Sequence, residues 1–393
     1  MIFPKNLKPV AAAVAAVVWA AAGHAGETVE VGNDVKLDWK LTGTYTAAQR
    51  MKSADPVLAK NAGANDGDNN FGKNAMTANR LSALWESRLY KGDSGFVLSA
   101  STFYDDVYHR SNDNDGKYGN PNKPPAFNEF TEQAKRYHGG YSRILDAYAY
   151  SSFRLGDESR ATVRVGRHVV NWGESVFFPN MSMAQGPFDG TKTGIPGTET
   201  KDSVLPEDQI SASIEMSPRW TLLGHAQFGF HPTIAPAPGS FLNTSDGIGP
   251  GGNCLSPWMV VPALGFNGCS FGARKGDIKP GKTGQWGVGT RFRVTDATEV
   301  GGYYLNYNDR TPLPEINVFT PGPIKGSALG SGSYQVRYFD NIKLLGGTVS
   351  TTFGEVSAYA EYTYREGAPV LVDAIIDPAK KTTIATPTRG NMS

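Results

Sequence analysis

A group of polar and aromatic residues between positions 168 and 174 is the part of the sequence best suited to chemistry. His168, Asn171 and Glu174 are spaced three residues apart, and Trp172 lies among them. A zinc site needs three or four converging ligands, and the nearby sequence offers no other histidine or cysteine. Neither a metal site nor catalysis is therefore favoured. The favoured interpretation is a loop anchor, with Trp172 buried against a wall and Asn171 or Glu174 bonded to loop amides. Contact with a ligand is the alternative.

A predicted strand delivers this group into a long loop. Val163 and Val165 point to one face and Arg164 to the other, which is the alternation of a half-buried strand. The alternation is expected to end at Arg167, and the loop to continue to about Pro206. Loops carried by a rigid sheet are where β proteins often place functional groups.

The first 25 residues predict an export signal. Lys5 and Lys8 precede the apolar run Val10–Ala22, and the small residues Gly23 and Ala25 follow it, as in a cleaved secretory signal peptide. The run is short for a membrane helix, so a membrane anchor is the less favoured alternative. The sequence has a formal net charge of +1, and without these two lysines the mature chain stays near neutral. Nucleic acid is therefore not an expected partner.

About eleven strands of roughly ten residues are predicted after the signal. The clearest is Asp34–Tyr45, where Leu37, Trp39 and Leu41 share one face and charged residues the other. The remaining strands are predicted over about 81–89, 96–104, 145–155, 161–165, 210–216, 222–230, 286–294, 300–307, 342–353 and 356–364.

Tight turns and long loops alternate strictly between these predicted strands. This segregation is typical of outer-membrane barrels, which have short periplasmic turns and long external loops, and a soluble sandwich has no need of it. Strands of about ten residues also match a tilted membrane crossing. The predicted fold class is therefore all-β, an antiparallel transmembrane β-barrel of the outer-membrane type over residues 26–393. A soluble sheet with one wet face is the alternative.

The second face of the predicted strands is rich in charge, which suits a water-filled lumen and would cost about 2–4 kcal/mol per residue at the lipid midplane. The predicted lumen-facing charges are Arg88, Arg154, Arg291, Arg293 and Glu361. The long loop is expected to fold into the barrel mouth and narrow it. The residues predicted to line this constriction are Arg164, His168, Asn171, Trp172 and Glu174.

The end of the sequence does not fit a complete barrel. Residues Ala368–Ser393 form a polar stretch containing proline and threonine, with no clear strand. An odd count of strands is unusual for a closed bacterial barrel. We therefore expect the chain to be truncated at its C-terminus.

Three stretches of this sequence resemble a known family. They are VGRHVVNWGESVFFPN, TKTGIPGTETKDSVLPEDQIS and NIKLLGGTVSTTFGEVSAYAEYTYREGAPV. They are similar to Gram-negative outer-membrane proteins of the "thirteen-oh-two" domain family of unknown function. The resemblance implies a barrel with a signal peptide and relatives that extend beyond residue 393. It also implies an association with uptake or export of hydrophobic compounds, and no established reaction.

Cys254 and Cys269 are the two cysteines of the chain and fall in one long loop. An exported protein meets an oxidising compartment, so a disulfide between them is predicted. Two free thiols are the alternative.

The predicted function is a channel, or an uptake or export protein, for small apolar or amphipathic compounds. An adhesin or scaffold that binds partners through its long loops is the alternative, and an outer-membrane hydrolase is less favoured because the sequence shows no recognisable set of nucleophile and base. No enzyme activity, metal or cofactor is predicted. The expected location is the outer membrane of a Gram-negative bacterium. Expected partners are outer-membrane lipid and lipopolysaccharide, with a small hydrophobic solute and periplasmic or membrane proteins as further candidates.

Overall fold

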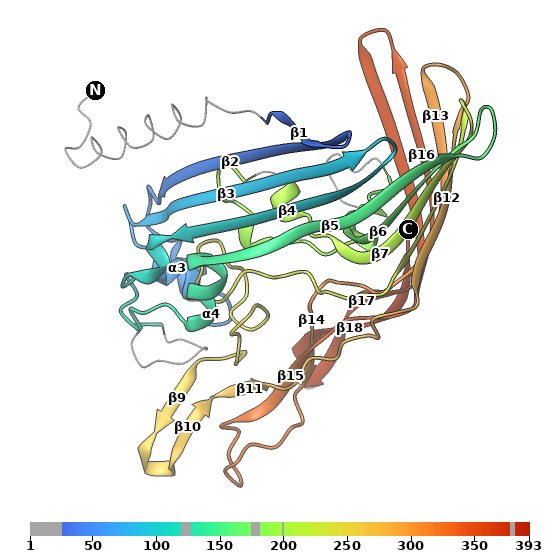
Figure 1. Cartoon of the computed structure of the whole chain (residues 1–393). Helices are drawn as coiled ribbons and strands as arrows, with labels where there is room; N and C mark the ends of the chain where they lie inside the picture. Colours follow the sequence, from blue (N-terminus) through green and yellow to red (C-terminus); the bar gives the residue numbers. More distant parts are fainter. Residues whose placement is uncertain (1–25, 119–126, 174–180, 199, 378–381) are drawn as a thin grey trace.

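The computed structural model describes residues 26–118, 127–173, 181–198, 200–377 and 382–393. The predicted signal peptide lies outside these residues. Their main feature is one sheet of thirteen strands, in which every neighbouring pair is antiparallel (Figure 1). In sheet order the strands are β1 (Thr28–Gly32), β2 (Val35–Gln49), β3 (Met76–Lys91), β4 (Ser94–Asp105), β5 (Gly140–Arg154), β6 (Arg160–His168), β7 (Glu207–Ser217), β8 (Trp220–Gln227), β12 (Gln285–Arg293), β13 (Thr298–Tyr307), β16 (Ile342–Phe353), β17 (Val356–Asp377) and β18 (Thr382–Met392).

Shorter elements lie in the long connections. A hairpin joins β9 (Trp258–Val261) to β10 (Phe266–Cys269), and a small sheet orders β11 (Phe271–Arg274), β15 (Ser331–Arg337) and β14 (Leu313–Asn317). The short helices are α2 (Pro56–Ala59), α3 (Asp66–Asn70), η2 (Asp106–His109), α4 (Glu132–Ala134), η3 (Lys135–Gly139), η4 (Met181–Ala184), η5 (Gly190–Lys192), α5 (Thr200–Ser203) and η6 (Pro262–Leu264). No helix in the described part of the chain is long and apolar enough to cross a membrane.

All eleven predicted strands are present, as β2 to β8, β12, β13, β16 and β17. Tight turns and long connections alternate between them, so this part of the prediction is confirmed, as is the all-β, antiparallel class. Two boundaries differ from those expected. Asp34 lies in the turn before β2, with φ of +61°. The alternation continues through Arg167 to His168, because Arg167 pairs across the sheet with Asp208.

The prediction of a strandless polar tail is wrong. Residues 368–377 belong to β17 and 382–392 form β18, which pairs with β17 over its length. Proline discourages a strand because it cannot donate to the ladder. Here Pro369 lies beyond Glu366, where pairing with β16 ends, and Pro387 lies in the edge strand β18. Each proline therefore has a side without a ladder partner, where its missing N–H has no consequence.

The two faces of the main sheet differ in chemistry. On β3, Leu81, Trp85 and Leu89 point to one side and are 55%, 53% and 41% exposed, whereas Arg80 and Leu84 point to the other and are buried. Cross-strand register continues both rows through the sheet. Other exposed apolar residues in the outward row include Phe96, Leu98, Ile144, Val165, Ile210, Trp286, Val288, Phe292, Leu345, Val349 and Tyr362.

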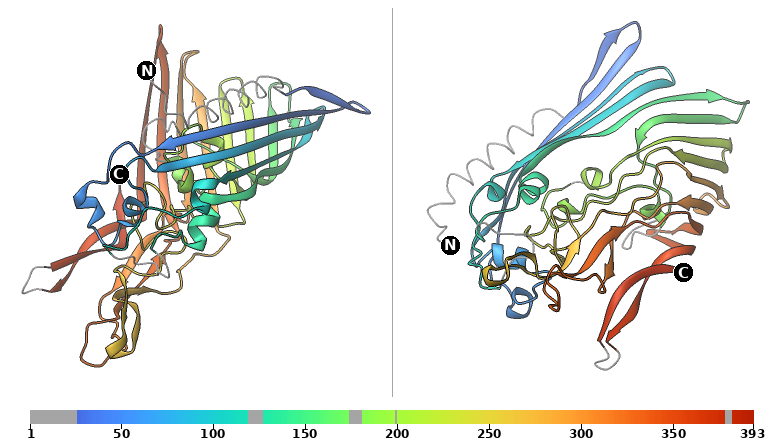
Figure 2. Two further views of the ribbon diagram at one scale, coloured as in Figure 1. Left: turned by 90° about the vertical axis from the view of Figure 1, so that its left-hand side faces the viewer. Right: turned by 90° about the horizontal axis from the view of Figure 1, so that it is seen from below.

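The main sheet is curved, and the connection between β6 and β7 lies on its concave side (Figure 2). Trp172, Met181 and Ala184 from this connection pack against Leu305 and Leu344, which point inward from β13 and β16. The largest hydrophobic cluster of the described residues therefore lies between a loop and the sheet.

Candidate functional site

A polar cavity of about 330 Å³ lies between the concave face and the start of the β6–β7 connection. Four of the residues singled out from the sequence line it: Arg164, Asn171, Trp172 and Arg291. They come from β6, from the connection that follows it, and from β12. The antiparallel order β6–β7–β8–β12 explains the meeting, because it places distant segments side by side on one face.

Trp172 closes one side of this cavity and is only 5% exposed. Its ring lies 4.8 Å from the ring of His225 and 5.8 Å from that of Tyr303, between centroids. Position 287 has no side chain, and an added Cβ there would come within 2.9 Å of the Trp172 ring. The indole of Trp172 therefore packs directly on the backbone of Gly287, in space that a side chain at position 287 would fill.

The polar side chains around the cavity have unused hydrogen-bonding capacity. Within the described residues, Arg164 and Asn171 have no side-chain hydrogen bond or ion pair; Arg164 has a cation–π contact with Tyr148 at 5.8 Å. Nε of Arg291 is buried without a hydrogen-bond partner there, and Nη1 approaches Glu299 only to 4.0 Å. The cavity can therefore satisfy polar groups of a guest.

The two ends of the cavity differ in charge. Glu215 lines it near Arg291, because Thr221 is the cross-strand neighbour of both. Arg164 is paired across the sheet with Ser211 instead. Glu215 lies four residues further along β7, about 13 Å away along the strand. Among the described lining residues, the Arg164 end therefore holds a cation and no carboxylate, although Asp146 of β5 lies within electrostatic range of Arg164. At the Arg291 end, the negative charges of Glu215 and Glu299 offset the positive charge of the arginine.

His168 does not line the cavity with the others. It is 1% exposed, its Nε2 lies 2.7 Å from Ser211 Oγ, and its Nδ1 lies 3.0 Å from the Gly166 carbonyl. Both ring nitrogens thus have partners within β6 and β7. His168 holds these strands together at the point where the chain leaves the sheet.

Glu174 lies outside the described residues, as do the neighbouring Phe177 and Phe178. A different carboxylate holds the loop here. Glu361 of β17 accepts a 2.8 Å hydrogen bond from the backbone N–H of Met181. Gly173 has φ of +99°, and any Cβ at that position would collide with the Glu361 carboxylate. The positive φ at this position favours glycine, because residues with a Cβ rarely adopt it.

The other predicted lumen-facing charges are distributed along the sheet and not gathered at the cavity. Arg88 pairs with Asp38 of β2 at 2.8 Å. Arg154 and Arg293 are exposed and end β5 and β12 beside tight turns. Their role in a lumen remains a prediction.

Sequence reasoning missed a buried polar cluster that fixes the rest of the loop. Asp189 is fully buried and accepts hydrogen bonds from the Tyr141 hydroxyl, from Arg143 Nη1 at 2.9 Å and from Thr191 Oγ1 at 2.6 Å. Lys192 contacts Asp202 and is 2% exposed. Burial lowers the pKa of Lys192, and the contact with Asp202 opposes that shift. The available signal was the density of paired charges over residues 189–202.

A second missed cluster lies deeper, around an ion pair between Arg310 and Glu207. Arg310 Nη2 lies 3.3 Å from Glu207 Oε2 and 2.6 Å from Gln227 Oε1, and Nη1 donates to the Ala184 carbonyl at 3.0 Å. Both charged residues are at most 2% exposed. Such a pair is costly to break once buried, so Arg310 locks η4 onto β7 and β8.

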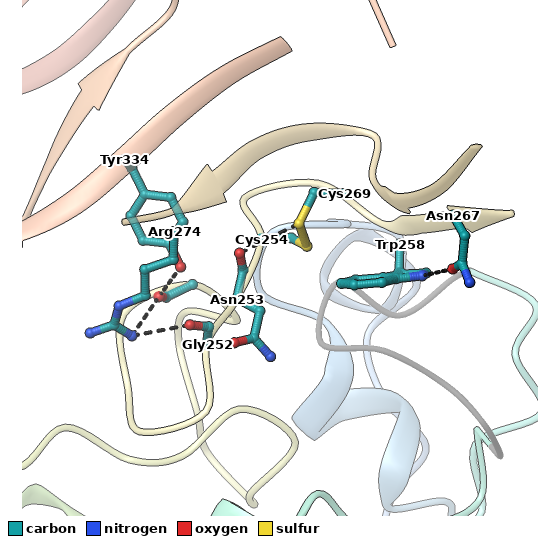
Figure 3. The surroundings of a disulfide bond; sticks show 9 residues. Gly252, Asn253, Cys254, Trp258, Asn267, Cys269, Arg274 and Tyr334 are labelled. Carbon is teal, nitrogen blue, oxygen red and sulfur yellow. Dashed lines mark hydrogen bonds between the residues drawn. A yellow bond between two sulfur atoms is a disulfide. The ribbon is translucent and has the colours of Figure 1, made fainter. Parts of the chain in front are cut away.

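The predicted disulfide is present. Cys254 and Cys269 are bonded, with 5.6 Å between their Cα atoms (Figure 3). Close by, Nη1 of Arg274 donates to the carbonyl of Gly252 at 3.2 Å and Trp258 Nε1 donates to Asn267 Oδ1 at 2.7 Å. The β9–β10 hairpin is thus fastened at its base. Among the described residues, no three His, Cys, Asp or Glu side chains are placed to hold a metal ion.

The model of one protein family matches residues 7–391, and its description is "Protein of unknown function (DUF1302)". The chain belongs to this family. The match extends over the whole curved sheet and includes the β6–β7 connection, which carried the resemblance noted from the sequence. This DUF1302 chain matches no protein of curated function.

Several solved structures are distantly similar to this DUF1302 chain. The ferric enterobactin receptor PfeA of Pseudomonas aeruginosa, in a mutant form, is 11% identical with a TM-score of 0.35; the match covers 89% of this chain and 54% of that one. OpdK of Pseudomonas aeruginosa, solved with vanillate, is 11% identical with a TM-score of 0.31 and coverage of 86% and 68%. The outer membrane channel DcaP of Acinetobacter baumannii is 12% identical with a TM-score of 0.24 and coverage of 87% and 81%. The DUF1302 chain thus spans 54% of the receptor's length.

Proposed function

We propose that this DUF1302 chain forms the wall and inner loop of an outer-membrane β-barrel that passes small apolar or amphipathic compounds. The distribution of side chains supports a membrane location. The convex face of the sheet exposes an apolar row, which lipid would cover, whereas the concave face carries the charged side chains beside the apolar residues that pack against the loop. Only closed barrels and helices satisfy every backbone group in lipid, so β1 and β18, the edges of the described sheet, would need partners in the membrane.

The observation that supports the proposal most directly is that the β6–β7 loop is bound to the concave face of the sheet by several separate contacts. Thr46 Oγ1 donates to the carbonyl of Pro196 at 2.9 Å, and Lys201 forms an ion pair with Glu86. Together with Trp172 and Glu361, these contacts spread the loop over the wall from β2 to β17. A loop held across the inside of a barrel narrows its lumen, and charges in a narrow pore set its selectivity.

The test is a loop deletion in planar bilayers. Removing Met181–Thr200 should raise single-channel conductance while leaving insertion intact. Its matched control removes Pro262–Gly265 from the β9–β10 tip, which projects away from the concave face (Figure 1), and should leave conductance unchanged. The proposal also expects the protein in outer-membrane fractions, migrating faster on gels unheated than boiled. Recovery as a soluble periplasmic protein would contradict it.

A second candidate, an adhesin or scaffold, is favoured by one observation. The tip of the β9–β10 hairpin exposes apolar side chains: Met259 is 42%, Val260 58% and Leu264 54% exposed. Apolar side chains exposed together can mark a contact with another protein. If the loop deletion changes neither conductance nor solute flux, this candidate becomes the better one. Neither proposal includes a catalytic step.

A further inference from the structure

We infer that the cavity beneath Trp172 takes an organic anion, with a carboxylate at Arg164 and an apolar body toward Trp172 and Leu223. This inference rests on the proposed function and names the class of compound that its cavity would select. Two features of the cavity lead to it: a guanidinium at one end that has no ion pair among the described residues, and an aromatic wall beside it.

The cation is Arg164. Its guanidinium has no ion pair within the described residues, although it lines a cavity that water or a solute can enter. Guanidinium groups bind carboxylates through two parallel N–H···O bonds. Asn171 lines the same cavity, and its side-chain amide has no described partner. A carboxylate at this end would satisfy donors that have no partner among the described residues.

The apolar part of the site comes from Trp172, Leu223 and Val170, which contribute to the cavity lining. Trp172 is held by His225 and Tyr303, so its ring is already oriented before a guest arrives. A fixed aromatic wall reduces the entropy cost of binding a flat or aliphatic group. The cavity volume of about 330 Å³ falls within the range of small-molecule sites.

The opposite end of the cavity explains why an anion is expected at Arg164 and not at Arg291. Glu215 shares that end with Arg291, and Glu299 approaches Arg291 to 4.0 Å. Carboxylates so placed oppose a second anion. The site therefore prefers a molecule with one charged head and a neutral body.

The experiment compares 4-phenylbutyrate with its neutral amide, 4-phenylbutyramide, by calorimetric titration of the full chain in detergent. The acid is expected to bind at least tenfold more tightly than the amide. Arg164→Gln should remove that difference, and Arg164→Lys should keep part of it because the charge remains without the bidentate geometry. Arg219→Gln, which removes an exposed guanidinium from the β7–β8 turn outside the cavity, should change neither affinity.

Equal affinity for acid and amide overturns the inference, as does unchanged acid binding in Arg164→Gln or no binding of either compound. Bilayer conductance of the same preparation separates this failure from that of the proposed function. A chain that conducts but does not prefer the acid keeps the channel and loses the anion site. A chain that prefers the acid but neither conducts nor transports it keeps the site and loses the channel.

Discussion

The backbone N–H of Met181 is hydrogen-bonded to Glu361 Oε1 at 2.8 Å, although 180 positions separate the two residues in the chain. β17 is the sixth strand after β6 in sheet order, so this bond fastens the loop far from the strand that delivers it. The loop thereby links β6 to β17 across the concave face, and we call this link the brace.

Glu361→Ala is expected to loosen this brace. A hydrogen bond to a charged group contributes about 1.5–3 kcal/mol, so local opening should increase by about tenfold or more. Tryptic cleavage after Lys192 measures the opening, because the Lys192 side chain is 1% exposed in the closed loop. Asp38→Ala is the control, since Asp38 pairs with Arg88 of the next strand and not with the loop. Equal cleavage rates in the two variants would contradict the brace.

Gly287→Ala is expected to displace Trp172. The new Cβ would lie 2.7 Å from the His225 ring and 2.9 Å from the Trp172 ring, and overpacking of this kind costs about 1–3 kcal/mol. Tryptophan emission should shift to longer wavelength as the indole meets water. Gly224→Ala on β8 makes the same change where the nearest atom is 3.9 Å away. Emission unchanged in Gly287→Ala would show that the wall can accommodate a methyl group.

Removing the disulfide by Cys254→Ser and Cys269→Ser is expected to affect the β9–β10 hairpin alone. The bond closes a sequence separation of 15, worth about 3 kcal/mol in the chain-entropy model. Proteolysis within residues 255–268 should accelerate while heat-modifiable migration on gels persists. Loss of membrane insertion in this variant would instead assign the bond to folding of the sheet.

The stability of the α3 region should depend on pH through Asp246. Burial raises the pKa of Asp246 to about 6 from an ordinary value of 3.8, against hydrogen bonds from the amides of Asn65 and Asp66. The folded state therefore binds a proton more tightly than the unfolded state. By linkage, the unfolding free energy falls as pH rises between about 4 and about 6 and is level above that. Proteolysis of residues 56–72 across this range measures it, and Asp246→Asn should abolish the dependence. The same slope in the variant would exclude Asp246.

Much of the sheet could be predicted because its information is local. Apolar and polar residues alternate along β2 and β3, and turn residues mark the ends of these strands, so both signals can be seen in a short stretch of sequence. The tail was missed because Pro369 and Pro387 argue against strands wherever a full ladder is assumed. A strand tolerates a proline on a side where it has no neighbouring strand. Which strands have such a side is known only once the sheet is assembled.

The candidate site was only partly predictable. Arg164, Asn171 and Trp172 lie close in sequence, so the signal for them was local, while Arg291 was found as an inward charge without any hint of its neighbours. The buried pair of Arg310 and Glu207 left no pattern in the sequence. Loop-to-wall contacts of that kind depend on side chains brought together by folding, and no spacing along the chain encodes them.

The parallel pairing of β11 with β15 has a practical consequence. It joins the connection after β8 to the connection after β13 in one small sheet, so residues inserted into β11 or β15 would disturb both connections. A tag placed in either connection near these strands would break shared backbone bonds. The β9–β10 tip has no such constraint, because Ala263 and Leu264 are exposed and the disulfide closes the hairpin below them. Insertions are best tolerated at exposed tips of this kind, so an epitope for surface labelling belongs between Ala263 and Leu264.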